Sequence, residues 1–293
     1  MGTTYTIDMY GRNTGVMQAA AEGALEEAGR IDRMLSNYRP ESELTRVNEH
    51  AAHQPVKISR ELFDLLTTCV EYSRASQGAF DITVAPLMKV WGFYKDSGRL
   101  PDRAEVRAAL GQIGYRTIEL NPASHTIRFA RQGVSLDPGG VGKGYAVDKM
   151  VEVLRKSGIA CALVSGGGSS IYGMGAPPDS PKGWCVPVRD PKDEKKTAAE
   201  VYLRDESIST SGNYEKFFWA NGKLYSHIMD PRTGFPAEGM LAVSVIAPKT
   251  LDSEVWAKPY YILGSAWTRA HKPRDFQVFL CEDKPGAACA WVR

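Results

Sequence analysis

The feature that most constrains the fold is a helix with a glycine-rich loop at each end, within residues 135–168. The sequence SLD leads into PGGVGKG, an amphipathic stretch YAVDKMVEVLRKSG follows, and the run ACALVS stops at three glycines, Gly166 to Gly168. This order predicts strand, loop, helix and strand. The two glycine loops would meet at one edge of a sheet, which is a common position for a bound ligand.

Lys143 lies among the glycines of the first loop, where an ammonium and bare N–H groups could bind phosphate oxygens. The loop does not match GxxxxGK[ST], because Asp137 and Gly144 stand where that motif needs Gly and Ser or Thr. It does not match GxGxxG either, because Tyr145 replaces the last glycine. A tight strand-to-helix turn with a solvated lysine explains the segment equally well, so both interpretations stay open.

Composition excludes several classes of protein. The chain has 293 residues, 43% of them apolar, and its 36 basic and 34 acidic residues are interspersed, which predicts no nucleic-acid partner. No apolar run reaches the roughly 18 residues that cross a bilayer. The five cysteines include no CxxC pair, so they indicate neither a zinc site nor a disulfide framework, and we expect mostly buried thiols.

Hydrophobic periodicity predicts several further elements along the chain. These are a strand over residues 3–9, helices over 15–35 and 59–74, a short helix ending at Leu110, a hairpin formed by TIEL and TIRFA, and an exposed excursion over 173–184.

The stretch YSHIMDPRTGFP, residues 225–236, places His227 beside a turn rich in Pro and Gly. Such a turn is rigid, and a histidine held in one place can accept a proton from a hydroxyl. Read alone, the segment is more often a loop with a hydrogen-bonded histidine than a catalytic site. The nearby SISTSGNYEKFF, residues 207–218, is by itself typical of a polar turn.

Six segments together resemble successive motifs of the FAD:protein FMN transferases, the ApbE-like family. In chain order they are MGTTYTI, LSNYRPESELTRVN, AFDITVAPLMKVWGF, LDPGGVGKGYAVD, STSGNYEKFF and YSHIMDPRTGFP. The resemblance extends from Met1 to about Gly264. It implies an α+β, T-fold-like structure in which residues 1–293 form a single flavin-transferase unit of two intimately joined lobes, with FAD at their junction.

Members of that family cleave FAD and attach FMN through a phosphoester to a Ser or Thr hydroxyl of a target protein, usually a subunit of a membrane redox complex. The resemblance therefore implies an enzyme whose partners are FAD and an acceptor protein. Met1 matches a motif that normally follows a secretion or lipoprotein signal. We therefore expect a preceding segment, and a periplasmic, membrane-anchored lipoprotein of the cell envelope, although a cytoplasmic location stays open.

The resemblance also assigns roles to individual residues. His227 would be the base that takes the proton of the acceptor hydroxyl as it attacks the FMN phosphorus, held in direction by the turn after Asp230. Lys143 would lie near the pyrophosphate. The remaining positions that would contact FAD are Met1, Tyr38, Ala79, Phe80, Asp81, Asp137 and Ile228.

Family members use a divalent cation, usually Mg²⁺, held by a glycine-loop carbonyl and by an Asp and a Thr four residues apart. The carbonyl is available here at Gly140 or Gly142. Counting back from Gly264 places Glu254 at the Asp position and Lys258 at the Thr position. Because a protonated lysine offers no lone pair, the resemblance implies that Mg²⁺ binding is impaired.

An ordinary Glu–Lys pair on a helix surface is the alternative at these two positions. Pro259 argues against it, because a proline disfavours helical geometry in the residue before it. We therefore expect the Lys258 ammonium to replace the metal and to pair with Glu254 and with the pyrophosphate.

Three functions stay open from the sequence. The first is FMN transfer to a protein hydroxyl, which the His227 segment supports. The second is FAD binding or storage without transfer, which the altered metal positions support. The third is FAD pyrophosphate hydrolysis, in which water replaces the acceptor hydroxyl.

Overall fold

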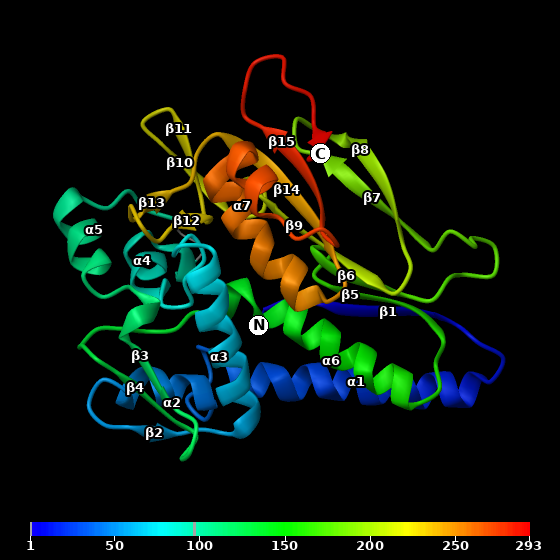
Figure 1. Ribbon diagram of the computed structural model, residues 1–293, viewed down its shortest axis with the longest axis horizontal. Helices are drawn as coiled ribbons and strands as arrows, with labels where there is room; N and C mark the ends of the chain where they lie inside the picture. The colour runs from blue at the N-terminus through cyan, green and yellow to red at the C-terminus, as the bar shows by residue number, and fades with distance from the viewer. Residues whose placement is uncertain (1, 96–97) are drawn as a thin grey trace. The chain divides into compact units, whose positions relative to one another are not determined.

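The computed structural model describes residues 2–95 and 98–293, and its chain divides into two compact units (Figure 1). The first unit consists of Met1–Asp32, Val141–Gly212 and Gly239–Arg293. The second consists of Arg33–Gly140 and Asn213–Glu238. Each unit is therefore assembled from segments that are distant in sequence.

The first unit contains a seven-stranded sheet in the order β1-β5-β6-β9-β14-β15-β16, in which every neighbouring pair is antiparallel. Its strands are β1 (Tyr5–Tyr10), β5 (Cys161–Gly166), β6 (Ser170–Met174), β9 (Glu206–Gly212), β14 (Met240–Ala247), β15 (Gln277–Glu282) and β16 (Ala290–Trp291). A separate long hairpin joins β7 (Trp184–Asp190) to β8 (Asp193–Leu203).

Three helices pack with this sheet, namely α1 (Thr14–Leu35), α6 (Gly142–Lys156) and α7 (Thr250–His271). Ala20, Ala24 and Ala28 recur every fourth residue on α1, and these small side chains lie in one core cluster with α6, β5 and β6. Figure 1 shows α1 and α6 side by side. Helix α7 contacts α6, β9 and β14, and its helical geometry is interrupted at Gly264.

The described residues of the second unit form four α-helices and three small sheets. The helices are α2 (Glu43–His50), α3 (Arg60–Ala75), α4 (Ala85–Val90) and α5 (Arg103–Leu110). The strands are β2 (Val56–Lys57), β3 (Ile118–Asn121) and β4 (Thr126–Phe129) in one sheet, and the hairpins β10 (Phe217–Ala220) with β11 (Lys223–Ser226) and β12 (Met229–Asp230) with β13 (Phe235–Pro236). Trp91 is fully buried in this unit and donates from Nε1 to the Gly234 carbonyl at 2.9 Å.

The α+β fold class is confirmed, and so are most of the expected elements. Strand β1, helices α1, α3, α5 and α6, and the β3–β4 hairpin each lie within a few residues of their predicted bounds. Side-chain caps explain where α2, α3 and α5 begin, as at α3, where the Ser59 side chain accepts from the Leu62 N–H.

The strand expected at SLD, residues 135–137, is wrong. This segment is not part of a sheet: the Asp137 N–H donates to the Ile82 carbonyl at 2.8 Å, and the main-chain groups of Leu136 pair with side chains. Asn48 Oδ1 accepts from the Leu136 N–H at 2.7 Å, and the side-chain amides of Asn37 and Asn48 both donate to the Leu136 carbonyl at 3.1 Å. Two asparagines thus satisfy the main-chain groups that a neighbouring strand would have taken.

The expectation of mostly buried thiols is also wrong. Cys281 and Cys289 form a disulfide, Cys185 is exposed, Cys161 is half-buried and only Cys69 is a buried free thiol. The two cysteines of the disulfide are eight residues apart in the sequence. The antiparallel pairing of β15 with β16 brings them together.

Within the described residues, no helix has both the length and the apolar character needed to span a membrane.

Candidate active site

The glycine loop opens helix α6, and a carboxylate from α7 closes its first turn. Gly144 donates its N–H to Glu254 Oε2 at 2.6 Å, and Lys143 Nζ lies 3.5 Å from Glu254 Oε1. No side chain caps α6 at Val141, so the Glu254 carboxylate does so from 110 residues away. A carboxylate is favourable there because it meets both an unpaired N–H and the positive end of the helix dipole.

Gly144 is required for this approach of the two helices. A Cβ added at Gly144 would lie 2.5 Å from the Thr250 carbonyl oxygen and 2.9 Å from Glu254 Oε2. Both distances are too short for carbon, so only a glycine permits the contact.

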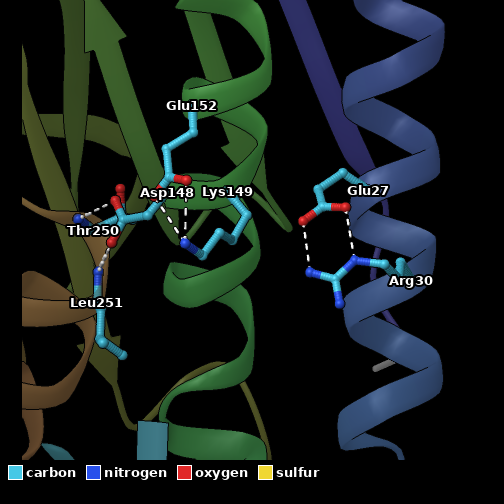
Figure 2. A network of polar contacts seen from close by, with 7 residues as sticks. All are labelled: Glu27, Arg30, Asp148, Lys149, Glu152, Thr250 and Leu251. Atoms are coloured by element: carbon cyan, nitrogen blue, oxygen red, sulfur yellow. Dashed lines mark hydrogen bonds and ion pairs between the residues drawn. The ribbon is translucent and has the colours of Figure 1, made fainter. Parts of the chain in front are cut away.

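The start of α7 is closed in the same way by a carboxylate from α6. Asp148 accepts from the N–H of Thr250 at 2.7 Å and from that of Leu251 at 2.9 Å, as Figure 2 shows. Figure 2 also shows the ion pair Lys149–Glu152 on α6 and, apart from the cap, the ion pair Glu27–Arg30 on α1. Burial raises the pKa of Asp148 to about 6 and outweighs the two N–H donors, which lower it.

The second glycine loop meets the first, as the sequence predicts. A Cβ placed on Gly166 would lie 3.5 Å from Lys143 Cβ, and one on Gly167 would lie 3.6 Å from Lys143 Cδ. The lysine side chain therefore runs along Gly166 and Gly167, and its ammonium ends beside Glu254.

Lys258 lies one turn after Glu254 on α7. The expectation that Pro259 prevents helical geometry there is wrong, because α7 continues through a buried Pro259 and is fixed by its packing on β9 and β14. The Lys258 ammonium donates to the main-chain carbonyl of Glu254 at 2.8 Å. The ion-pair partner of the Glu254 carboxylate is Lys143, which corrects the expected pairing with Lys258.

In the second unit, one carbonyl fixes the orientation of His227. Both the main-chain N–H and Nδ1 of His227 lie within hydrogen-bond distance of the Lys216 carbonyl, at 3.0 and 3.1 Å. A carbonyl can only accept, so Nδ1 carries the proton of the neutral ring and Nε2 is its basic nitrogen. Lys216, in the segment before β10, thus helps to orient the ring, and the Phe93 ring meets it edge-on at 6.4 Å. That the following turn also directs His227 stays a prediction.

Hydrogen bonds nevertheless stabilise that turn, residues 230–234. Asp230 Oδ1 accepts from the main-chain N–H of Arg232 at 3.0 Å and from its Nε at 2.9 Å. Asp230 Oδ2 accepts from Nη2 of the same arginine at 2.8 Å. Gly234 has a φ of 82° and donates to the Asp230 carbonyl at 2.9 Å. The turn therefore anchors the β12–β13 hairpin next to His227 in the chain.

Asp137 lies at the start of the glycine loop and is nearly buried. It accepts from the Tyr94 hydroxyl at 3.0 Å and from the Gly139 N–H at 2.7 Å. Burial, and then the charge of Asp137, raises the pKa of Tyr94. Tyr38 is 70% exposed and meets the Tyr94 ring edge-on at 6.3 Å.

The other predicted FAD contacts lie in the second unit and are buried. Ala79, Phe80 and Ile228 are each at most 5% exposed. Asp81 accepts from Thr83 and from the Tyr115 N–H, and burial raises its pKa. These bonds give Asp81 a structural role in its own turn, and the contact of these residues with FAD stays a prediction.

Gly140 ends the short 3₁₀ helix Pro138–Gly140, and Gly142 begins α6. Met1 lies outside the described residues. The structure thus gathers Gly142, Lys143, Glu254 and Lys258 in the first unit, and describes Tyr38, Ala79, Phe80, Asp81, Asp137, Gly140, His227 and Ile228 in the second.

Sequence reasoning missed Gly144 and Asp148 as residues that position the site. Asp148 is the last residue of the segment LDPGGVGKGYAVD. Its carboxylate lies on the otherwise apolar side of an amphipathic helix, and this position was the signal that could have indicated a structural role. Its partners at Thr250 and Leu251 carry no such signal.

A lysine at a glycine-rich helix start suits the binding of an anion, and a histidine whose lone pair is on Nε2 can accept a proton. A model of the ApbE family matches residues 1–279, and the chain belongs to this family.

Relatives of known function agree with this membership. The chain is 33% identical over 282 residues to the FAD:protein FMN transferase of Treponema pallidum, covering 90% of this chain and 77% of the relative. It is 32% identical over 243 residues to that of Escherichia coli K12, covering 80% and 68%.

Solved structures show the same fold. The ApbE protein of Thermotoga maritima matches with a TM-score of 0.88 and 26% identity, over 99% of this chain and 93% of that chain. The flavin transferase ApbE of Vibrio cholerae matches with a TM-score of 0.83 and 25% identity, over the same shares.

We expect Gly144→Ala to lower the free energy of unfolding by about 1–3 kcal/mol, because its methyl group overlaps Thr250 and Glu254. Denaturant unfolding followed by circular dichroism measures this. Gly23→Ala, on α1, is the control, because its Cβ would make only an ordinary contact with Val153 at 3.5 Å. Equal stability of Gly144→Ala and wild type would contradict the required close approach.

We expect the stability advantage of wild type over Asp148→Asn to shrink as pH rises from about 4 to about 6. The folded-state pKa of Asp148 is raised to about 6, so the folded protein holds a proton that the unfolded chain has lost, and stability falls through this window. Unfolding free energies at several pH values check this. Asp64→Asn, at an exposed position on α3, controls for the loss of one negative charge. A constant difference between wild type and Asp148→Asn would refute the assignment.

Proposed function

We propose that the protein transfers FMN from FAD to a Ser or Thr hydroxyl of an acceptor protein. The hydroxyl oxygen attacks the FMN phosphorus, a new P–O bond forms, and the pyrophosphate P–O bond to AMP breaks. The hydroxyl proton passes to the enzyme, and AMP leaves with the electron pair of the broken bond. The activity of the relatives named above supports this proposal.

The observation that carries the proposal is the fixed tautomer of His227. Because Nδ1 donates to the Lys216 carbonyl, the neutral ring presents a lone pair at Nε2 and can accept the hydroxyl proton. A second bond from the main-chain N–H of His227 to the same carbonyl holds the residue in place. An anchored base of this kind lowers the reorganisation needed for proton transfer.

Lys143 supplies the positive charge for the pyrophosphate. Its ammonium is held beside the start of α6, where helix N–H groups and the dipole favour an anion. Tyr38, Asp137, Ile228 and the segment Ala79 to Asp81 complete the proposed FAD contacts on the strength of the family resemblance.

Incubation with FAD and a candidate acceptor protein tests the proposal. Mass analysis of the acceptor and detection of AMP distinguish the outcomes, since transfer gives both the FMN mass gain and AMP. AMP without acceptor gain would indicate hydrolysis, and neither product with FAD bound would indicate storage.

We expect His227→Ala to lose transfer by about 10²- to 10⁴-fold while FAD affinity is nearly unchanged, because a general base acts in the transition state. Transfer rates and flavin fluorescence titrations measure the two quantities. His53→Ala is the control, because His53 is exposed and outside the site. Parallel losses of FAD affinity and transfer in His227→Ala would make His227 a residue that holds FAD instead of the base.

The proposal extends to the acceptor and to the compartment. The acceptor is a subunit of a membrane redox complex, and the protein works in the cell envelope, on the periplasmic side. The Cys281–Cys289 disulfide supports this location, because disulfides persist in oxidising compartments and are rare in the cytoplasm.

We expect protein isolated from the envelope and unfolded without reductant to show three alkylatable cysteines, and five after reduction. Peptide mapping should link Cys281 to Cys289 and leave Cys69, Cys161 and Cys185 alkylated in both samples. Five alkylated cysteines before reduction would remove the support for an oxidising compartment.

A further inference from the structure

We infer that this protein binds FAD without a divalent cation, because Glu254 caps α6 and holds the Lys143 ammonium instead of binding a metal. The inference rests on the proposed function, since FAD is its ligand. It makes Glu254 a positioning residue for Lys143.

The Glu254 carboxylate is engaged by its own chain. Its side chain is 3% exposed, and Oε2 accepts from the Gly144 N–H at 2.6 Å. Oε1 is buried and has no hydrogen-bond partner, which by itself would suit a metal ion. The Lys143 ammonium, however, already lies 3.5 Å from Oε1, so a dication bound there would share one buried oxygen with a like charge.

The second position that the family resemblance gives to the metal also lacks a suitable donor. Lys258 carries an ammonium that donates to the Glu254 carbonyl at 2.8 Å, and an ammonium has no lone pair for a cation. Mg²⁺ requires near-octahedral oxygen ligands, and the residues present do not fit it.

The two lysines provide the charge that FAD requires. One carboxylate and two ammonium groups leave this part of the first unit with a net charge of about +1, which attracts a pyrophosphate. An aspartate, a lysine and a dication would give about +2. The lower charge still permits binding but polarises the transferring phosphoryl group less, so we expect transfer to be slow.

Flavin fluorescence titrations of the wild type in EDTA and in Mg²⁺, with calorimetry of Mg²⁺ added to the protein alone, test the inference. We expect FAD dissociation constants within about twofold of each other and no saturable Mg²⁺ binding. An increase in FAD affinity of about tenfold or more with Mg²⁺, or saturable Mg²⁺ binding, overturns the inference and leaves FMN transfer intact. Absence of FAD binding in both buffers overturns the proposed function as well.

Variants test whether Glu254 and Lys258 are the reason that FAD affinity does not depend on Mg²⁺. The double variant Glu254→Asp, Lys258→Thr restores the Asp and Thr of the family pattern, and we expect Mg²⁺ to increase its FAD affinity about tenfold. Thermal unfolding without ligand establishes that it is folded. A folded double variant whose FAD affinity does not change with Mg²⁺ contradicts the inference.

The single variant Lys258→Thr leaves Glu254 in place as the cap of α6. It tests the inference if the double variant does not fold. We expect it to weaken FAD binding in EDTA by about tenfold, because one ammonium is lost. Lys249→Thr, at an exposed position just before α7, is the charge-matched control and should leave the affinity unchanged. Equal FAD affinities for Lys258→Thr and Lys249→Thr would overturn the role given to Lys258.

Discussion

Two carboxylates, Asp148 and Glu254, each close the open start of the helix that carries the other. Neither α6 nor α7 has a side-chain cap of its own, so the N–H groups of each first turn depend on its partner helix. Gly144 allows the two helices to come close enough for both contacts. The position of Lys143 follows from this arrangement, because the same carboxylate that caps α6 holds its ammonium.

This reciprocal capping also limits the chemistry of the site. The Glu254 carboxylate accepts a short hydrogen bond from the Gly144 N–H through Oε2, and its Oε1 lies beside the Lys143 ammonium. A cation at Oε1 would therefore lie against a like charge. Glu254 thus contributes by capping α6 and by positioning Lys143.

In the second unit, the corresponding constraint is a hydrogen bond that sets the tautomer of His227. The main-chain carbonyl of Lys216 accepts a hydrogen bond from Nδ1 of His227, so the lone pair of the neutral ring is on Nε2. Burial of the Tyr94 hydroxyl against Asp137 similarly fixes the start of the glycine loop. In this unit, hydrogen bonds to main-chain and side-chain groups thus position His227 and the start of the glycine loop.

The sequence by itself determined the helices α1, α3 and α6, the β3–β4 hairpin, the meeting of the two glycine loops and the family, because periodicity, turn residues and ordered motifs are local signals. It did not determine the pairing of Leu136 with two asparagines, the Cys281–Cys289 bond or the helical path through Pro259. Nor did it reveal that Glu254 caps α6. Gly144 and Glu254 are 110 residues apart, and Leu136 and Asn48 are 88 apart. Only tertiary packing decides which distant polar group satisfies a buried N–H, since many side chains in the sequence could do so and the fold brings just one within reach.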